Sequence, residues 1–207
     1  MQPLTKNDCE FYLNSGELTR PFLDKDYILE KDMLDYNSKI QKHPNYIILE
    51  SLFHWIQHCV PYSQDGEFRN ANKFQRTAKE MWESGNATGC TDYAQLFATL
   101  ARQLGYPTTI LHTAEYNWLK RLKTGGDSMM HIGHSFCECF YEGKWVLVDP
   151  MAQRIEFDYN PEKIELSYEV GGNSIFIPYF RGLDIGFKHT TEEHCNNMDK
   201  LCQDLEI

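Results

Sequence analysis

The sequence predicts an α+β protein in which helices and an antiparallel β-hairpin belong to one folded unit. The chain has 207 residues, 42% hydrophobic and 24% charged, with no internal repeat and no linker rich in Gly, Ser or Pro. Residues 90–105 carry an apolar stripe at helical spacing, and residues 133–149 have the pattern of two strands joined by a tight turn. We therefore expect a single domain over residues 1–207.

Within this domain we expect three parts. The motif-bearing core covers about residues 46–155, a helical N-terminal extension covers 1–45, and a C-terminal annex covers 156–207. The annex combines strand-like aromatic residues at 173–187 with a final helix near the end of the chain. We expect the annex to close one side of a substrate cleft.

Charge and cysteine content narrow the classes of function. The 30 acidic residues outnumber the 20 basic ones, so a surface for nucleic acid is not expected. The sequence shows neither a secretory signal nor an apolar run long enough to span a membrane. We therefore expect a cytoplasmic protein without a membrane partner. The odd number of cysteines then predicts reduced thiols rather than a disulfide framework. They stand at positions 9, 59, 90, 137, 139, 195 and 202.

The helices before the hairpin follow from spacing and end signals. Residues 46–60 have helical periodicity and stop at Pro61, and residues 71–83 form a second candidate. The strongest candidate starts at Cys90, with Thr88 as the expected N-cap, and ends before Gly105. A buried strand at 108–114 follows, and then a loop of about fifteen residues precedes the next strand.

The hairpin fixes which residues face each other. If Glu142 and Gly143 form a two-residue turn, Tyr141 pairs with Lys144 and Glu138 pairs with Leu147. Even-numbered residues of the first strand then share a face with odd-numbered residues of the second. His134 and Asp149 become diagonal neighbours with Cα atoms roughly 7–8 Å apart. Their side chains are therefore predicted to meet.

Three residues form a candidate catalytic group. Cys90 stands at a helix N-terminus, where the helix dipole and exposed N–H groups favour a thiolate. His134 can take and return a proton, and Asp149 can hold the histidine ring in one tautomer. The backbone N–H of Cys90 can donate to an oxyanion. This arrangement predicts nucleophilic catalysis by sulfur.

The same segments resemble the motifs of the transglutaminase-like superfamily. Residues 89–107 resemble its cysteine motif, residues 134–138 its histidine motif and residues 144–150 its aspartate motif. The resemblance spans roughly residues 60–155 and implies a single-domain member of the bacterial type. It further implies a papain-like core, in which the cysteine helix packs on an antiparallel sheet that carries the histidine and the aspartate.

Members of this superfamily act on amide bonds through a thioester, so we expect Cys90, His134 and Asp149 to be the catalytic residues. The family also uses an upstream aromatic side chain at the oxyanion. Tyr62 is similar to that residue, with Trp55 and Trp82 as competitors. We expect hydrolysis of a peptide or protein amide without a cofactor, because the chain lacks a calcium loop and the β-domains of cross-linking members.

Other interpretations remain open at this point. His112 is an alternative base, and acyl transfer to an amine or a silent peptide-binding module are alternative functions. The spacing of His131, His134, Cys137 and Cys139 also suggests a metal site. Strand alternation opposes that site, because His134 and the two cysteines point to opposite faces. We therefore expect no metal.

Overall fold

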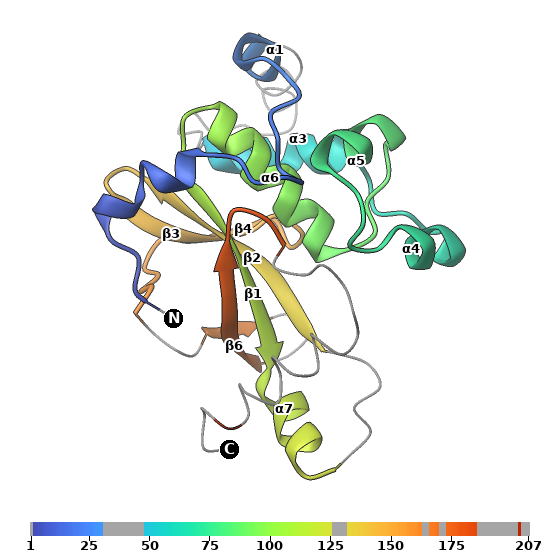
Figure 1. The fold of residues 1–207 in the computed structure, drawn as a ribbon, viewed down its shortest axis with the longest axis vertical. Coiled ribbons are helices and arrows are strands. Elements are labelled where there is room, and N and C mark those ends of the chain that lie inside the picture. The colour runs from blue at the N-terminus through green and yellow to red at the C-terminus, as the bar shows by residue number, and fades with distance from the viewer. Residues whose placement is uncertain are drawn as a thin grey trace.

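The computed structural model describes residues 2–30, 48–125, 132–162, 166–169, 173–185 and 203. Figure 1 shows helices gathered over one end and one face of a twisted sheet. The helical elements are η1 (Lys6–Asp8), η2 (Phe11–Leu13), α1 (Lys25–Glu30), α3 (Ile48–Cys59), α4 (Gly66–Asn72), α5 (Ala78–Ser84), α6 (Cys90–Gln103) and α7 (Tyr116–Lys123). The strands are β1 (Thr108–Glu115), β2 (Gly133–Tyr141), β3 (Lys144–Asp149), β4 (Arg154–Glu156), β5 (Leu166–Glu169) and β6 (Asn173–Gly182). The α+β fold class is confirmed.

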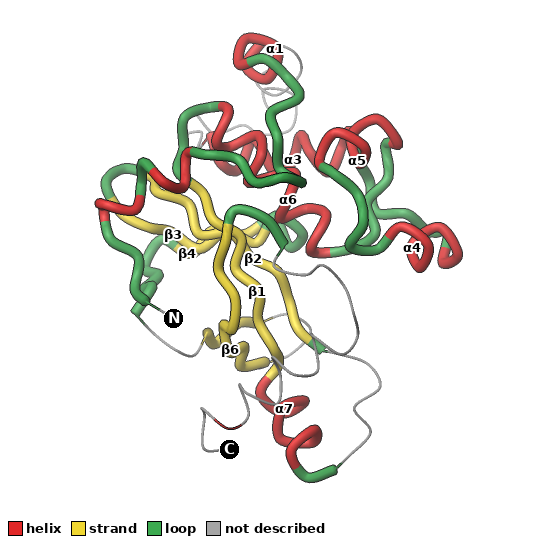
Figure 2. The backbone as a smooth tube through the Cα atoms, viewed as in Figure 1, coloured by secondary structure: helices red, strands yellow, loops and turns green. Residues whose placement is uncertain are grey.

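The described strands form one sheet in the order β4-β3-β2-β1-β6-β5, and every adjacent pair is antiparallel (Figure 2). The main core lies between this sheet and α3, α5 and α6. Strand β6 comes from the predicted annex, yet it lies beside β1 in the middle of the sheet. The sheet is thus completed by a segment beyond the three motifs.

The β2–β3 hairpin has the predicted register. Tyr141 pairs with Lys144 and Glu138 pairs with Leu147. The turn residues Glu142 and Gly143 have φ angles of 49° and 88°. Two positive φ angles are what a two-residue turn needs to match the strand twist, so the turn sets the pairing of the whole hairpin.

Helix α6 is the central helix of the core. Its residues from Thr91 to Arg102 are all buried, and it packs on β1 and β2 on one side and on α3 and α5 on the other. Arg102 is buried near its C-terminal end and donates from Nε to the carbonyl of Thr108 at 2.8 Å. Burial lowers the pKa of Arg102 to about 10. The helix therefore has a fixed position against the sheet.

Three local predictions were wrong or incomplete. The helix expected at 71–83 is broken, because α4 ends at Asn72 and α5 begins only after Thr77, which forms a capping box with Glu80. The N-cap of α6 is Gly89 instead of Thr88. The expected fifteen-residue loop contains helix α7, whose N-cap Glu115 accepts bonds from two backbone N–H groups. The last predicted helix lies mostly outside the described residues, as do residues 31–47.

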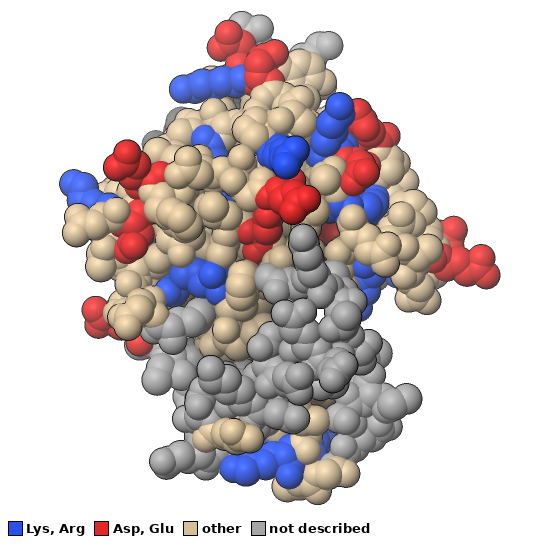
Figure 3. Space-filling model, viewed as in Figure 1, with Lys and Arg blue, Asp and Glu red and all other residues tan. Residues whose placement is uncertain are grey.

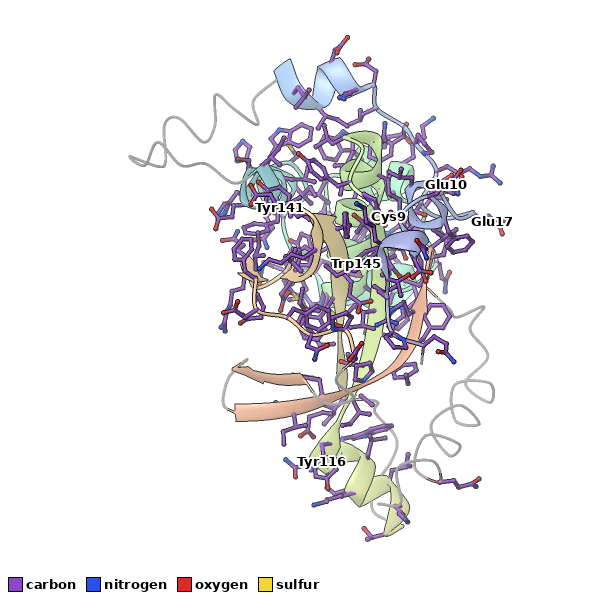
Figure 4. All side chains as sticks on the ribbon, turned by 90° about the vertical axis from the view of Figure 1, so that its left-hand side faces the viewer. Cys9, Glu10, Glu17, Tyr116, Tyr141 and Trp145 are labelled. Atoms are coloured by element: carbon purple, nitrogen blue, oxygen red, sulfur yellow. The ribbon has the colours of Figure 1, made fainter. Side chains whose placement is uncertain are left out.

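The N-terminal segment lies beside the sheet, with Cys9 and Glu10 near Trp145 of β3 (Figure 4). The indole Nε1 of Trp145 donates to the carbonyl of Thr5 at 3.0 Å, and the ring of Tyr12 packs edge-on against Trp145. Further along, the side chain of Thr19 donates to the carboxylate of Asp184 at 2.9 Å. These contacts attach the start of the chain to β3 and to the residues that follow β6, both distant in sequence.

The surface carries charges of both signs (Figure 3). Lysine and arginine gather over α7, whose last turn contains Lys120, Arg121 and Lys123, all exposed. Among the described residues, no helix has the length and apolar character required to cross a membrane.

Candidate active site

Cys90 is the first residue of α6, as predicted. The Asp92 carboxylate shapes the approach to it, because one oxygen accepts from the backbone N–H of Thr88 at 2.8 Å and from Arg76 Nη2 at 2.6 Å. Gly89 makes no side-chain cap, so it brings no acceptor to the first N–H groups of the helix. The helix start therefore carries a thiol and backbone donors together.

His134 and Asp149 meet as the hairpin register requires. Histidine Nε2 and aspartate Oδ2 are 2.7 Å apart, and the Asp149 side chain is buried. The second carboxylate oxygen accepts from the backbone N–H groups of Met151 and Ala152 at 3.0 and 2.9 Å. The Asp149 side chain is thereby fixed in position and orients the His134 ring.

The Cys90 thiol interacts with this pair, since it shares a side-chain hydrogen bond with His134. Burial opposes the thiolate, but the hydrogen bond and charge of His134 outweigh it, so the net pKa of Cys90 is lowered. Burial likewise opposes the charged histidine, yet Asp149 and Cys90 raise the pKa of His134 to about 10. The three side chains thus shift the equilibrium toward a thiolate beside an imidazolium.

Ser135 lies beside Cys90 and contacts Thr91 and His112, and neither Ser135 nor Thr91 was identified from the sequence patterns. The backbone and the hydroxyl of Ser135 both lower the pKa of the Cys90 thiol. The Ser135 hydroxyl also lies 3.1 Å from Thr91 Oγ1 and 2.8 Å from His112 Nδ1. Strand alternation could have indicated Ser135, because the residue after His134 must face the helix. The proposed alternative base, His112, is bonded to this serine.

The aromatic candidates for the oxyanion have different environments. Trp55 and Trp82 contact each other with ring centroids 4.9 Å apart, and Trp55 is buried in the core. Tyr62 is 38% exposed, and its backbone bridges to Ala87 in the loop that leads to Cys90. Trp82 is half-buried, so Tyr62 is the most exposed of the three, and its role in catalysis stays a prediction.

Strand alternation separates the residues of the suggested metal site. Cys137 and Cys139 are buried in the core under α6, whereas His134 packs against Phe136 and Phe176 on the other face. His131 lies outside the described residues. Within the described part of the chain, no group of three or more His, Cys, Asp or Glu side chains has the arrangement of a metal site.

A thiol at a helix N-terminus, beside a histidine that is bonded to an aspartate, has the arrangement of a cysteine nucleophile with its base. The family model of the transglutaminase-like superfamily matches residues 35–150, which is more than half of the chain. The protein belongs to the transglutaminase-like superfamily. This membership supports a cysteine-dependent enzyme in general terms.

A comparison with solved structures gave a crystal structure titled as a "putative cysteine protease" from Cytophaga hutchinsonii. The two proteins are 16% identical and superpose with a TM-score of 0.49, over 87% of this chain and 48% of the other. This chain therefore spans about half the length of that protein. A search among curated proteins gave no match.

Proposed function

We propose that this protein is a cysteine-dependent amide hydrolase that acts through a thioester, with Cys90 as nucleophile. The observation that carries the proposal is the contact of Cys90 with His134, whose ring is bonded to Asp149 at 2.7 Å. A lowered pKa of the thiol and a raised pKa of the histidine support an ion pair ready for attack. The substrate class is a peptide or protein amide.

The reaction has two stages. The Cys90 thiolate attacks the amide carbonyl carbon, and the resulting oxyanion accepts a hydrogen bond from the Cys90 N–H, with Tyr62 as a second donor. The C–N bond breaks as the His134 imidazolium gives its proton to the leaving amine. Neutral His134 then takes a proton from water, which attacks the thioester and releases a carboxylic acid and the thiol.

Acyl transfer differs only in the second stage, where an amine replaces water. We favour hydrolysis because water needs no binding site of its own beside the thioester, whereas a transferred amine does. A silent binding module is disfavoured, since peptide recognition requires neither a lowered thiol pKa nor an oriented histidine.

The test begins with limited alkylation by iodoacetamide at pH 7, followed by peptide mapping. Cys90 should react faster than Cys9, which is also partly exposed but whose pKa is raised mainly by burial. Equal rates at the two cysteines would contradict the proposal. A fluorogenic peptide-amide library, with and without a fluorescent primary amine, then separates hydrolysis from transfer by the mass of the acyl product.

A further inference from the structure

The Ser135 hydroxyl occupies a position between three polar groups. It lies 2.8 Å from His112 Nδ1 and 3.1 Å from Oγ1 of Thr91, the residue next to Cys90, and it lowers the pKa of the Cys90 thiol. Ser135, Thr91 and His112 are all buried. They come from three elements, because β2 supplies the serine, α6 the threonine and β1 the histidine. The cluster therefore joins the nucleophile helix to two central strands.

The number of protons on these groups fixes the direction of their hydrogen bonds. A serine hydroxyl has one proton to donate and two lone pairs to accept with, whereas a thiolate can only accept. When Cys90 is a thiolate, the Ser135 proton therefore points to sulfur. Thr91 and His112 Nδ1–H must then donate to the serine oxygen. A chain of donors thus converges on the sulfur atom.

The surroundings of His112 hold its ring in place. In the β1–β6 pairing, Thr113 is opposite Pro178 and His112 is opposite Phe180, so Tyr179 is the extra residue of a β-bulge. The Tyr179 ring stacks on His112 with an interplanar angle of 24° and a centroid distance of 6.4 Å. The bulge turns an aromatic side chain onto the histidine, which fixes the plane of its Nδ1–H.

We infer that Ser135 is a further catalytic residue whose hydroxyl donates a hydrogen bond to the Cys90 thiolate, and that His112 and Thr91 are positioning residues for that hydroxyl. The inference rests on the proposed function, since it concerns the same sulfur atom. In this arrangement His134 and Ser135 approach the thiolate from adjacent positions of β2. His112 serves as a donor to serine and does not act as the base.

The experiment measures alkylation of Cys90 by iodoacetamide as a function of pH, with peptide mapping, in the full chain. Ser135→Ala should raise the midpoint of thiolate formation by about one pH unit, a tenfold loss of thiolate below the midpoint. His112→Phe keeps the stacked ring and removes the donor, so it should shift the midpoint in the same direction by a smaller amount. His112→Asn places an amide N–H near the position of Nδ1 and should restore the wild-type midpoint.

A second test variant is Thr91→Val, and its matched control is Thr99→Val. Both threonines are buried in α6, but Thr99 donates to the Gln95 carbonyl away from the site. Only Thr91→Val should raise the midpoint, and thermal unfolding of each variant reports the loss of stability separately. If Ser135→Ala fails to fold, the difference in alkylation midpoint between Thr91→Val and Thr99→Val tests the inference instead. Unchanged midpoints in folded Ser135→Ala, or in Thr91→Val, would overturn the inference.

Failure of the proposed function has a different signature. In that case the wild-type protein itself would show a Cys90 midpoint at about 8.5, the ordinary cysteine value. A low wild-type midpoint that no variant moves would instead leave the proposed function standing and reject the role of Ser135.

Discussion

Two regions of strand β2, three residues apart, have opposite effects on the pKa of a buried thiol. At the start, His134 and Ser135 contact Cys90, whose pKa is lowered because their interactions outweigh burial. In the middle, Cys137 donates to the Ala94 carbonyl at 3.3 Å, and burial raises its pKa well above the ordinary value. Burial alone makes a thiol inert, and a charged partner at the end of a helix reverses that effect.

Glu138 extends the same comparison to charged groups. It lies on the other face of β2 from Cys137, fully buried, and receives two hydrogen bonds from Arg181 at 2.5 and 2.6 Å. Tyr159 donates to it as well. Both carboxylate oxygens of Glu138 accept hydrogen bonds from protein side chains, so the Glu138–Arg181 pair has a structural role. Asp149, in contrast, holds a histidine whose other side contacts the thiol.

The largest expected effect separates the thiols of the two regions. Cys90→Ala should reduce turnover of an amide substrate at least about 10⁴-fold, because the nucleophile is removed. Its free energy of unfolding should change by less than about 1 kcal/mol, since the site is partly exposed. Cys137→Ala should do the reverse and lower stability by about 1–2 kcal/mol through a cavity while activity remains. Loss of folding in Cys90→Ala would show that the thiol is a packing residue.

The next effect tests the charge pair in the middle of β2. Glu138→Ala leaves the Arg181 guanidinium buried without its carboxylate and should destabilise the protein by about 3–5 kcal/mol in urea unfolding. Tyr159→Phe removes one donor to Glu138 and should lower stability by about 1 kcal/mol. Alkylation of Cys90 should be unaffected in the folded fraction of both. A slower reaction there would mean that the two regions are coupled.

The pH dependence sharpens the comparison at the start of the strand. Alkylation of Cys90 should rise as the pH passes its lowered pKa and then stay level, whereas turnover should fall again near pH 10. The fall follows from His134, whose pKa is raised to about 10 and which must carry a proton to release the amine. Each pH unit above that value should reduce turnover about tenfold. Cys137 should begin to react only at much higher pH.

The smallest effect concerns the space in front of Cys90. A Cβ added at Gly89 meets nothing within 4 Å, and its φ of 167° is extended, so Gly89→Ala should fold normally. The added methyl group should slow acylation by bulky substrates a few-fold. Gly85→Ala is the control, because its φ of 61° penalises a side chain by about 1 kcal/mol. Unchanged kinetics in Gly89→Ala would indicate that substrates approach from another side.

Much of the fold could be predicted from local patterns. The apolar stripe of α6, the strand at β1 and the Glu142–Gly143 turn each depend on a few neighbouring residues. The turn and the alternation along the strands were sufficient to bring His134 to Asp149. The break between α4 and α5 was missed, because its cause is the capping box of Thr77, a competing local signal.

The sequence by itself determined that Cys90 begins a helix and that His134 meets Asp149, since a helix start and a hairpin register are encoded within short segments. Only the tertiary structure decided what surrounds the sulfur atom. Ser135 and Thr91 are 44 residues apart, and β6 adds Tyr179 from beyond all three motifs. Such contacts depend on the packing of whole elements against one core, where many small terms act together. A periodic pattern in one segment carries no information about them.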